Sequence, residues 1–361
     1  MEQFIKKERR IPVSTWSWLR VNDTEIKLYG SKEAIEDRIS LPTGIYYSRN
    51  LDEFDFSEDP SAFFLSPDTI KFINENANYC HYIKIPKTYN GVEPIKINLY
   101  LDDQNPIITD DIIIEAEEDS NAAIILKYTS EKSVYHHCGR TRVIARKNSN
   151  IRIIKIQMME DESTHMDSIG VFVEEGAYAQ LLVGELGASK PISSCNIVLS
   201  GDESRADLDV LYLGHGSRNI DISTRVEHRG IKSISKTCVK GVLMDESKKI
   251  LRDTLDFISG SRGSKGSEEE SVLMLSPKVK NISVPILLCG EDDVEGEHAA
   301  SSGKPDDKIL FYLMSRGFSK IEAMKILAEA AFSSVIENIP DEELKDEILY
   351  TLRNIIMKGG I

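Results

Sequence analysis

One histidine of this chain closely follows two carboxylates. His298 comes after Glu295 and Glu297, behind an acidic turn that contains glycine. Imidazole and carboxylate together are suitable ligands for Fe(II), and a nearby carboxylate can orient the ring through a hydrogen bond. The alternative is a structural histidine that caps or hydrogen-bonds the helix opened by Pro305-Asp306-Asp307. These residue types predict a candidate metal site at His298, with Glu295 and Glu297 as its neighbours.

The thiols are dispersed along the chain. They stand at Cys80, Cys138, Cys195, Cys238 and Cys289. No CxxC pair is present, so the sequence has no zinc ribbon and no ferredoxin-like motif. Isolated cysteines are usually reduced core residues, and we expect this of most of the five. Cys289 is a further metal-ligand candidate because it precedes His298, although the apolar run 284–289 favours a buried strand.

The other histidines are weaker candidates for metal ligands. In His136-His137-Cys138 only the first and third residues can share a strand face, which falls short of a four-ligand site. His215 stands between Gly214 and Gly216, and His228 precedes Arg229-Gly230, so both are interpreted as turn residues.

The region between about 110 and 275 consists of short strand-like runs separated by polar turns. The turns recur at steps of 29, 27, 27 and 27 residues when counted at Ser120, Ser149, Gly176, Glu203 and Gly230. A regular step of this size is typical of a solenoid, in which each coil buries its apolar face against its neighbours. A β-sandwich is the alternative, because it also contains many short strands.

The predicted fold is therefore mainly β, a right-handed parallel β-helix over residues 106–303. A mixed α/β region over 1–105 precedes it. In that region, Pro67 to Ala77 has the pattern of a short helix, and we expect Trp16 and Trp18 to pack in a local core.

Residues 304–361 form a predicted α-helical C-terminal domain, since the apolar period changes there from 2 to 3.6. Two helices are separated at Gly317-Phe318, and a third begins at Pro340. The simplest role of these helices is to seal the last coil. Their apolar residues lie on more than one face, however, which indicates a surface left for a partner.

Composition excludes several function classes. The formal net charge of −15 argues against nucleic acid or an anionic membrane as a partner, because both require clustered cations. The first residues lack the apolar core of a signal peptide, and no apolar run has membrane-spanning length, so we expect a cytoplasmic protein. No phosphate-binding G-x-x-x-x-G-K-[ST] loop is present, so ATP chemistry is expected in another subunit.

Residues 284–318 read VPILLCGEDDVEGEHAASSGKPDDKILFYLMSRGF. This string resembles the C-terminal signature of the SufB/SufD family of iron–sulfur cluster assembly proteins. The signature is an acidic block followed by histidine, small residues and Gly-Lys, and then a helix that opens Leu-Phe-Tyr-Leu and closes Ser-Arg-Gly. The resemblance extends back to about residue 110, and more faintly to Trp16 and Trp18.

The resemblance is closest to SufD. His298 aligns with the histidine that SufD-type proteins use in cluster assembly. Gly296 stands where the SufD pattern often has a cysteine, so a thiolate ligand is missing there. The positions of the SufB-type cysteine and glutamate correspond to Val279 and Ala299, neither of which is a ligand.

The family implies a scaffold, with no catalytic residues of its own. It would pair with a SufB-like chain, or with a second copy of itself, through the C-terminal end of the solenoid, and a cysteine desulfurase would contribute indirectly. Iron or an Fe–S cluster would be held transiently at an interface, and no flavin motif is visible. A SufC-like ABC ATPase would dock on the helical domain at Phe311, Tyr312, Arg316, Gly317 and Phe318.

Three alternatives stay open at this point. The first is a SufB-like homodimeric scaffold, and the second is a purely structural adaptor. The third is a carbohydrate-active β-helix enzyme, against which stands the absence of repeated Asp/Glu constellations on consecutive coils.

Overall fold

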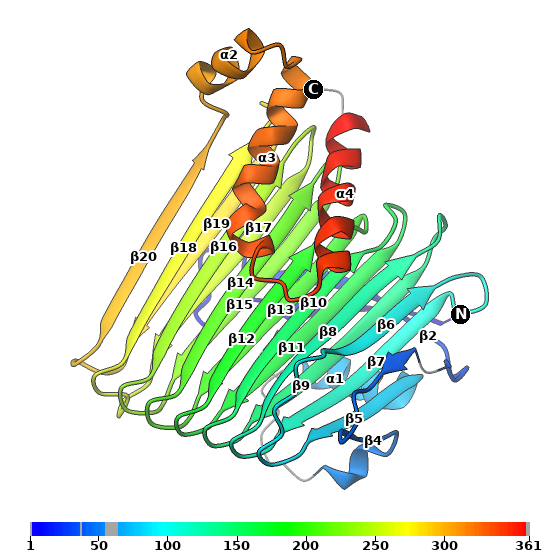
Figure 1. Cartoon of the computed structure of the whole chain (residues 1–361), viewed down its shortest axis with the longest axis vertical. Helices are drawn as coiled ribbons and strands as arrows, with labels where there is room; N and C mark the ends of the chain where they lie inside the picture. The colour runs from blue at the N-terminus through cyan, green and yellow to red at the C-terminus, as the bar shows by residue number, and fades with distance from the viewer. Residues whose placement is uncertain (1, 37, 55–63, 359–361) are drawn as a thin grey trace.

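The computed structural model describes residues 2–36, 38–54 and 64–358. Its body is a solenoid in which each coil contributes one strand to each of two nine-stranded sheets (Figure 1). The odd sheet contains β5 (Tyr79–Ile85), β7 (Ile107–Ala116), β9 (His136–Ala145), β11 (Thr164–Val173), β13 (Lys190–Leu199), β15 (Asn219–His228), β17 (Lys248–Phe257) and β19 (Lys280–Cys289). The even sheet contains β6 (Ile95–Leu101), β8 (Asn121–Ser130), β10 (Asn150–Met158), β12 (Tyr178–Glu185), β14 (Arg205–Gly214), β16 (Ile234–Leu243), β18 (Lys265–Met274) and β20 (Glu295–Gly303).

Successive coils pair in parallel register, which confirms the solenoid and rejects the sandwich. Asn121, Asn150, Tyr178 and Arg205 are register partners, at steps of 29, 28 and 27 residues. At the N-terminal end, the short strands β3 (Ile39–Ser40) and β4 (Tyr46–Ser48) add to β6 and β5 in antiparallel fashion. Since β5 and β6 already belong to the two sheets, the coils begin before residue 106; the division into three domains stays a prediction.

The space between the sheets is filled by stacked aliphatic side chains. Alternate residues of each strand point inward, and register places Ile124, Ile153, Leu181 and Leu208 in one row. All four are buried. Each such side chain contributes about 1.5–3 kcal/mol through burial, but only when the neighbouring coil is present. The coils therefore stabilise one another.

Three C-terminal helices follow the last strand, as predicted. They are α2 (Asp307–Ser315), α3 (Lys320–Ile336) and α4 (Glu342–Lys358). A capping box between Ser319 and Glu322 starts α3. Buried residues of α3 and α4, such as Phe332 and Ile348, form one cluster with outward-facing residues of the even sheet.

The helices do not seal the last coil, so that simple role is wrong. Figure 1 shows α3 and α4 across the outer face of the even sheet, while α2 projects beyond the ends of the strands. The physical reason is that this outer face carries Ile154, Leu211 and Val242. An apolar face of that kind requires a cover.

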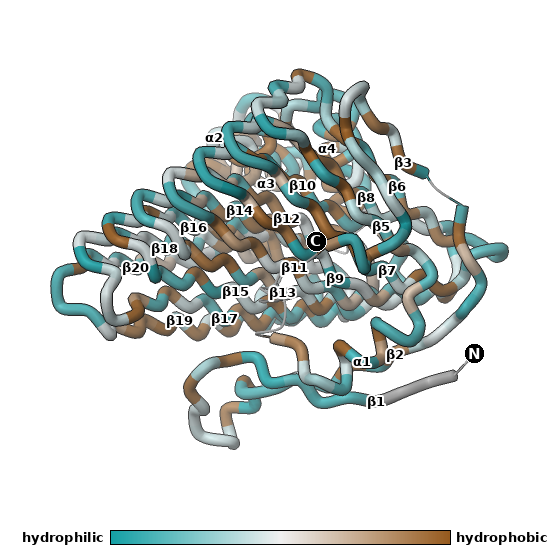
Figure 2. Tube along the Cα trace, turned by 90° about the horizontal axis from the view of Figure 1, so that it is seen from below, coloured by the Kyte–Doolittle hydropathy of each residue, from teal (hydrophilic) through white to brown (hydrophobic). Residues whose placement is uncertain are grey.

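The N-terminal region covers the opposite face of the solenoid. An antiparallel pair, β1 (Glu2–Arg9) and β2 (Asp23–Gly30), lies with helix α1 (Pro67–Asn76) beneath the odd sheet (Figure 2). The helix confirms the prediction for residues 67–77. Ile26 and Phe72 pack against the outward side chains of Cys138 and Met166. Two 3-10 turns complete the region, η1 (Ser17–Leu19) and η2 (Leu51–Glu53).

The expectation that Trp16 and Trp18 pack in a local core is wrong. Their side chains are 73% and 70% exposed, with ring centroids 6.0 Å apart. Both belong to the connection between β1 and β2, which crosses the odd sheet and turns its aromatic residues away from it. In the part of the chain that the structure describes, no helix has the length and apolarity needed to cross a bilayer.

The close packing of the interior predicts a specific intolerance at Gly241 in β16. A Cβ atom there would lie 1.9 Å from the ring of Tyr212, which is fully buried. We expect Gly241→Ala to lower the free energy of unfolding by about 1–3 kcal/mol through overpacking, measured by denaturant titration. Gly303→Ala in β20 is the matched control, because nothing lies within 4 Å of its Cβ position. Equal stability of the two variants would contradict this packing.

Candidate functional site at the open end of the solenoid

The last coil differs from all others because it has a neighbour on one side only. Strands β19 and β20 pair with β17 and β18, and their other edges are free within the described structure. Every residue of β20 is exposed, and β19 alternates between exposed and half-buried residues. The strand predicted at 284–289 is therefore present, but it is an edge strand and is not buried as predicted.

His298 lies in the middle of β20. The strand forms because residues 295–303 pair with β18. A Cβ atom on Gly296 would lie 3.0 Å from Leu287, so the even-numbered residues of β20 face the interior. His298 consequently points between the sheets at the open end, where its side chain is 27% exposed.

A buried carboxyl pair lies directly behind His298. The imidazole Nδ1 is 3.3 Å from an oxygen of Glu268, its register partner in β18. Burial raises the pKa of Glu268, and the adjacent Asp253 raises it further. Burial also raises the pKa of Asp253, although Thr224 donates a hydrogen bond to its carboxylate. Glu268 and Asp253 therefore form a buried acidic pair next to the imidazole.

Glu295 and Glu297 lie on the other face of the strand. Odd-numbered residues of β20 point away from the interior, and Glu295 forms an exposed ion pair of 2.8 Å with Lys265. The structure therefore does not bring either glutamate to His298, and Glu268 occupies the orienting position instead. The sequence contained a usable signal for Glu268, because it precedes His298 by 30 residues, about one coil.

Cys289 is exposed and is not a core residue, which corrects that expectation. It ends β19 in register with the buried Phe257, but no strand covers its other side. Gly296 lies opposite Leu287, so His298 is displaced from Cys289 along the strands. Among the described residues, no three or more His, Cys, Asp or Glu side chains are grouped so that they could hold one metal ion.

The interior next to this site is also charged. In the preceding coils, the ammonium group of Lys249 binds Glu270 and lies 2.9 Å from the hydroxyl of Ser283. Burial lowers the pKa of Lys249, while Glu270 acts to raise it. The ring of Tyr212 lies 5.5 Å from the same ammonium group. Sequence reasoning missed this cluster, because residues from several coils build it.

A second interior cluster occupies the early coils. His137 is paired with Asp110 and lies 2.9 Å from His165. Lys155 reaches Asp167 from the opposite sheet at 2.7 Å. All five side chains are almost fully buried.

The other histidines considered from the sequence lie on strands, except His215. His136 and Cys138 face outward while His137 faces inward, as strand alternation predicts. His215 does stand in a turn, 3.0 Å from Asp161. His228 does not: it ends β15, is fully buried and stacks on Phe257, because the strand continues to the residue before the turn.

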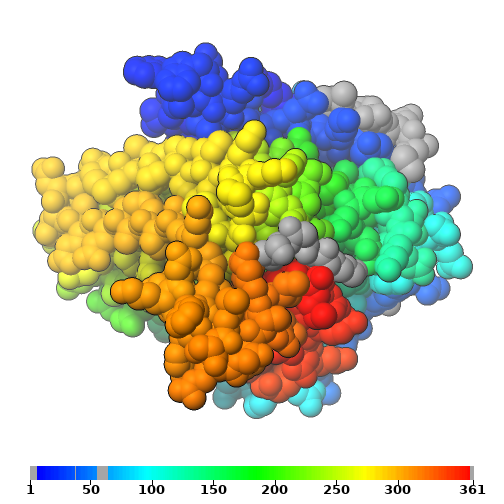
Figure 3. All heavy atoms as spheres, turned by 90° about the horizontal axis from the view of Figure 1, so that it is seen from above, coloured from blue at the N-terminus to red at the C-terminus, as the bar shows by residue number. Residues whose placement is uncertain are grey.

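Helix α2 carries the second candidate surface. None of its residues is buried. Phe311 and Tyr312 are 74% and 55% exposed, and the guanidinium of Arg316 lies over the Tyr312 ring at 5.2 Å. The positive φ of Gly317 ends the helix. Figure 3 shows that the helical end (orange) forms an outer surface of the molecule.

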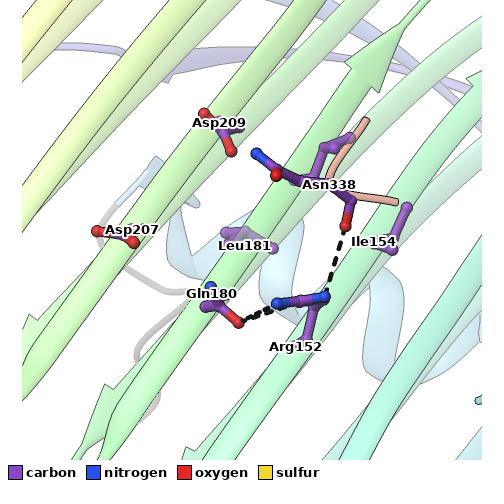
Figure 4. Close-up of a pocket in the computed structure, with 8 residues that line it drawn as sticks. Arg152, Ile154, Gln180, Leu181, Asp207, Asp209 and Asn338 are labelled. Atoms are coloured by element: carbon purple, nitrogen blue, oxygen red, sulfur yellow. Dashed lines mark hydrogen bonds between the residues drawn. The ribbon is translucent and has the colours of Figure 1, made fainter. Parts of the chain in front are cut away.

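A pocket of about 150 Å³ lies between the even sheet and the connection of α3 to α4 (Figure 4). Arg152 donates to the side-chain oxygen of Gln180 and to the carbonyl of Asn338. Burial and Asp207 raise the pKa of Asp209 to about 6. These contacts attach the helices to the sheet, and they do not approach His298.

The family model for the SufBD core domain of the SUF system of FeS cluster assembly matches residues 99–331, most of the chain. The chain belongs to the SufB/SufD family. Its relatives include the iron–sulfur cluster assembly protein SufD of Bacillus subtilis, 25% identical over 74% of this chain. SufBD family proteins of Staphylococcus epidermidis and Staphylococcus haemolyticus are 23% identical over 72% of it.

The SufD resemblance is thereby confirmed at the level of the family. The matched region spans 62% of the Bacillus subtilis protein and 57% of each staphylococcal protein. The match begins near β6 and reaches into α3, so it includes both His298 and α2.

The buried acid behind His298 predicts a pH dependence of stability. With its pKa raised above the ordinary value of 4.5, Glu268 holds a proton in the native state that the unfolded chain releases. Stability therefore falls as pH rises above about 4.5. Glu268→Gln should raise the free energy of unfolding at about pH 7 by about 1 kcal/mol or more, and should flatten this decline in denaturant titrations at several pH values.

Glu295→Gln is the control for this experiment. It removes a carboxylate from an exposed ion pair on the same coil, and such pairs contribute at most about 1 kcal/mol. A Glu268→Gln variant that is less stable than the wild type at neutral pH would show that the carboxylate is ionised.

Proposed function

We propose that this chain is a SufD-type scaffold subunit for iron–sulfur cluster assembly. The observation that carries the proposal is the position of His298, which faces the interior of the last coil, where the described structure adds no further strand. A neutral imidazole is a ligand for Fe(II), and the ring is held from behind by Glu268. Iron and sulfide are the substrates of such a scaffold, and the remaining ligands would come from a partner chain.

The free edges of β19 and β20 support pairing with a second solenoid chain. Edge strands expose unpaired backbone N–H and C=O groups, and natural proteins usually protect them. Both strands are long, with 10 and 9 residues. A second chain that added its own strands here would satisfy these groups and bring its ligands to His298. We favour a SufB-like chain as this partner. The present chain does not fit the SufB-like role itself, because Val279 and Ala299 stand where SufB-type chains carry their ligands.

The exposed apolar surface of α2 supports docking of an ABC ATPase. Phe311 and Tyr312 are exposed on a helix that projects from the solenoid, and Phe318 is exposed just after that helix. Large aromatic residues of this kind, with an arginine beside them, are typical of the dominant contacts in protein interfaces. ATP-driven movement of the ATPase would then be transmitted through α2 to β20, which directly precedes it.

Substitution of His298 tests the scaffold proposal. His298→Ala should lower cluster formation by the assembled complex by at least about tenfold, while unfolding free energy changes by about 1 kcal/mol or less because the side chain is partly exposed. Cluster yield is measured by absorbance and by iron and sulfide content.

Glu297→Ala provides the matched control, because it removes a ligand-type side chain from the outer face of the same strand. Full cluster yield with His298→Ala would reject the role of the imidazole. Loss with Glu297→Ala alone would move the site to the outer face.

The ATPase surface is tested without deleting the helices, since α3 and α4 cover the even sheet. Phe311→Ala combined with Tyr312→Ala should weaken ATPase binding by about tenfold or more, measured by calorimetry or co-purification. The melting temperature should not change, because neither residue is buried. Tyr350→Ala on α4, also an exposed aromatic residue, is the control. Undiminished binding by the double variant would place the ATPase elsewhere.

A further inference from the structure

The connection between β1 and β2, residues 10–22, presents an apolar tip to solvent. We call it the tryptophan loop. Four large apolar residues of the loop are exposed: Val13, Trp16, Trp18 and Leu19. Exposed tryptophans clustered on one loop are uncommon in proteins that act alone, and they mark interaction surfaces.

The base of the loop is held by buried charges. The Arg10 guanidinium is 1% exposed, donates to Asp221 at 3.2 Å and donates to the carbonyl of Ser193 at 2.6 Å. Arg252 binds the same carboxylate at 2.7 Å and donates to the carbonyl of Val21. Two arginines and one aspartate therefore fix both ends of the loop to the odd sheet.

The loop is also closed upon itself. The side chain of Asn22 accepts from the backbone N–H and the hydroxyl of Thr15 and donates to its carbonyl, each at 2.8 Å. The backbone N–H of Arg10 donates to the carbonyl of Asn22 at 2.8 Å. A loop ordered in this way loses little conformational freedom when its tryptophans are buried by a partner, which favours binding.

The loop is attached close to the free edge. Its anchors Asp221 and Arg252 lie on β15 and β17, and β17 pairs directly with the edge strand β19. Figure 3 shows the N-terminal segment (blue) alongside the late coils (yellow), and Figure 2 shows it beneath them. Adjacent strands are about 4.8 Å apart, so a chain added to β19 would begin about two strand spacings from Arg252.

The outer face of β19 carries an apolar surface beside Arg252, the anchor of the loop. Arg252 is the register partner of Val284, and alternation puts Ile282, Val284, Ile286 and Leu288 on this outer face. All four are half-buried. We call these four residues the edge stripe. In a two-fold pairing along this edge, each chain would place its edge stripe near the tryptophan loop of the other.

Charge favours the same arrangement. Residues 1–22 contain five basic and two acidic residues, in a chain whose net charge is −15. Three of the five basic residues form ion pairs with aspartates of the same chain. The exposed Arg9 and Arg20 are the cations that reduce the repulsion between two such acidic chains.

We propose that the tryptophan loop binds a second copy of this chain, which pairs along β19 and β20, and that Trp16 and Trp18 cover the edge stripe of that copy. The inference rests on the edge pairing proposed above, with a second copy of this chain in the place that a SufB-like chain would take, and adds the residues that extend the contact. A two-fold interface uses the same patch on both chains, and this chain carries both the loop and the stripe.

Tryptophan fluorescence tests this directly, because Trp16 and Trp18 are the only two tryptophans of the chain. The full chain is diluted across its association range, which sedimentation velocity defines independently. Association should shift the emission to shorter wavelength and reduce quenching by acrylamide. The double variant W16A/W18A should weaken self-association by about tenfold or more, while Val92→Ala, an exposed apolar residue on another loop, should not.

The outcomes separate the loop from the edge pairing. A dimer that forms without change in tryptophan emission, and with unchanged affinity in W16A/W18A, overturns the loop proposal and leaves the pairing intact. A chain that stays monomeric at all concentrations overturns self-pairing and the loop proposal together. An emission shift with anionic phospholipid vesicles, with none on self-association, assigns the loop to a lipid surface and also overturns the proposal.

Discussion

Each coil of this protein is stabilised by the coils next to it, and the candidate site depends on this constraint. Backbone hydrogen bonds and aliphatic rows both run from coil to coil, so a coil with one neighbour is left with half of its contacts. The last coil is in that position, because α3 and α4 cover the side of the solenoid and not its end. His298 therefore lies in an open interior, next to strand edges that pair with no other strand in the described part of the chain.

The interior itself departs from a purely apolar core. Glu268, Asp253, Lys249 and Glu270 are buried between the sheets behind the open coil. Charged groups in such a setting cost free energy unless they are paired, and removal of one partner leaves the other uncompensated. Packed aliphatic side chains would hold the coils together at lower cost. Buried charged pairs also occur in the early coils, at His137–Asp110 and Lys155–Asp167, so they are a feature of the interior and not of the open end alone.

Much of the fold could be read from the sequence, because its determinants are local or periodic. The turn spacing identified the solenoid, the change of apolar period identified the helices, and the string around His298 identified the family. What failed required knowledge of neighbours. Strand alternation should have separated Glu297 from His298, yet their closeness in sequence suggested a shared site. Glu268 was missed because its contact with His298 is made between coils. Trp16 looked like a core residue because no local pattern reveals which surface remains uncovered.

The anchoring of the N-terminal segment has a consequence for the order in which the molecule is built. Arg10 contacts Asp221, 211 residues later, and Arg252 contacts Val21, 231 residues earlier. Coils can stack one after another as they leave the ribosome, since each needs only its predecessor. Residues 10–22 are made before β15 and β17, and they can dock only when both strands exist. This segment thus completes its structure late, after the coils beneath it have assembled in register.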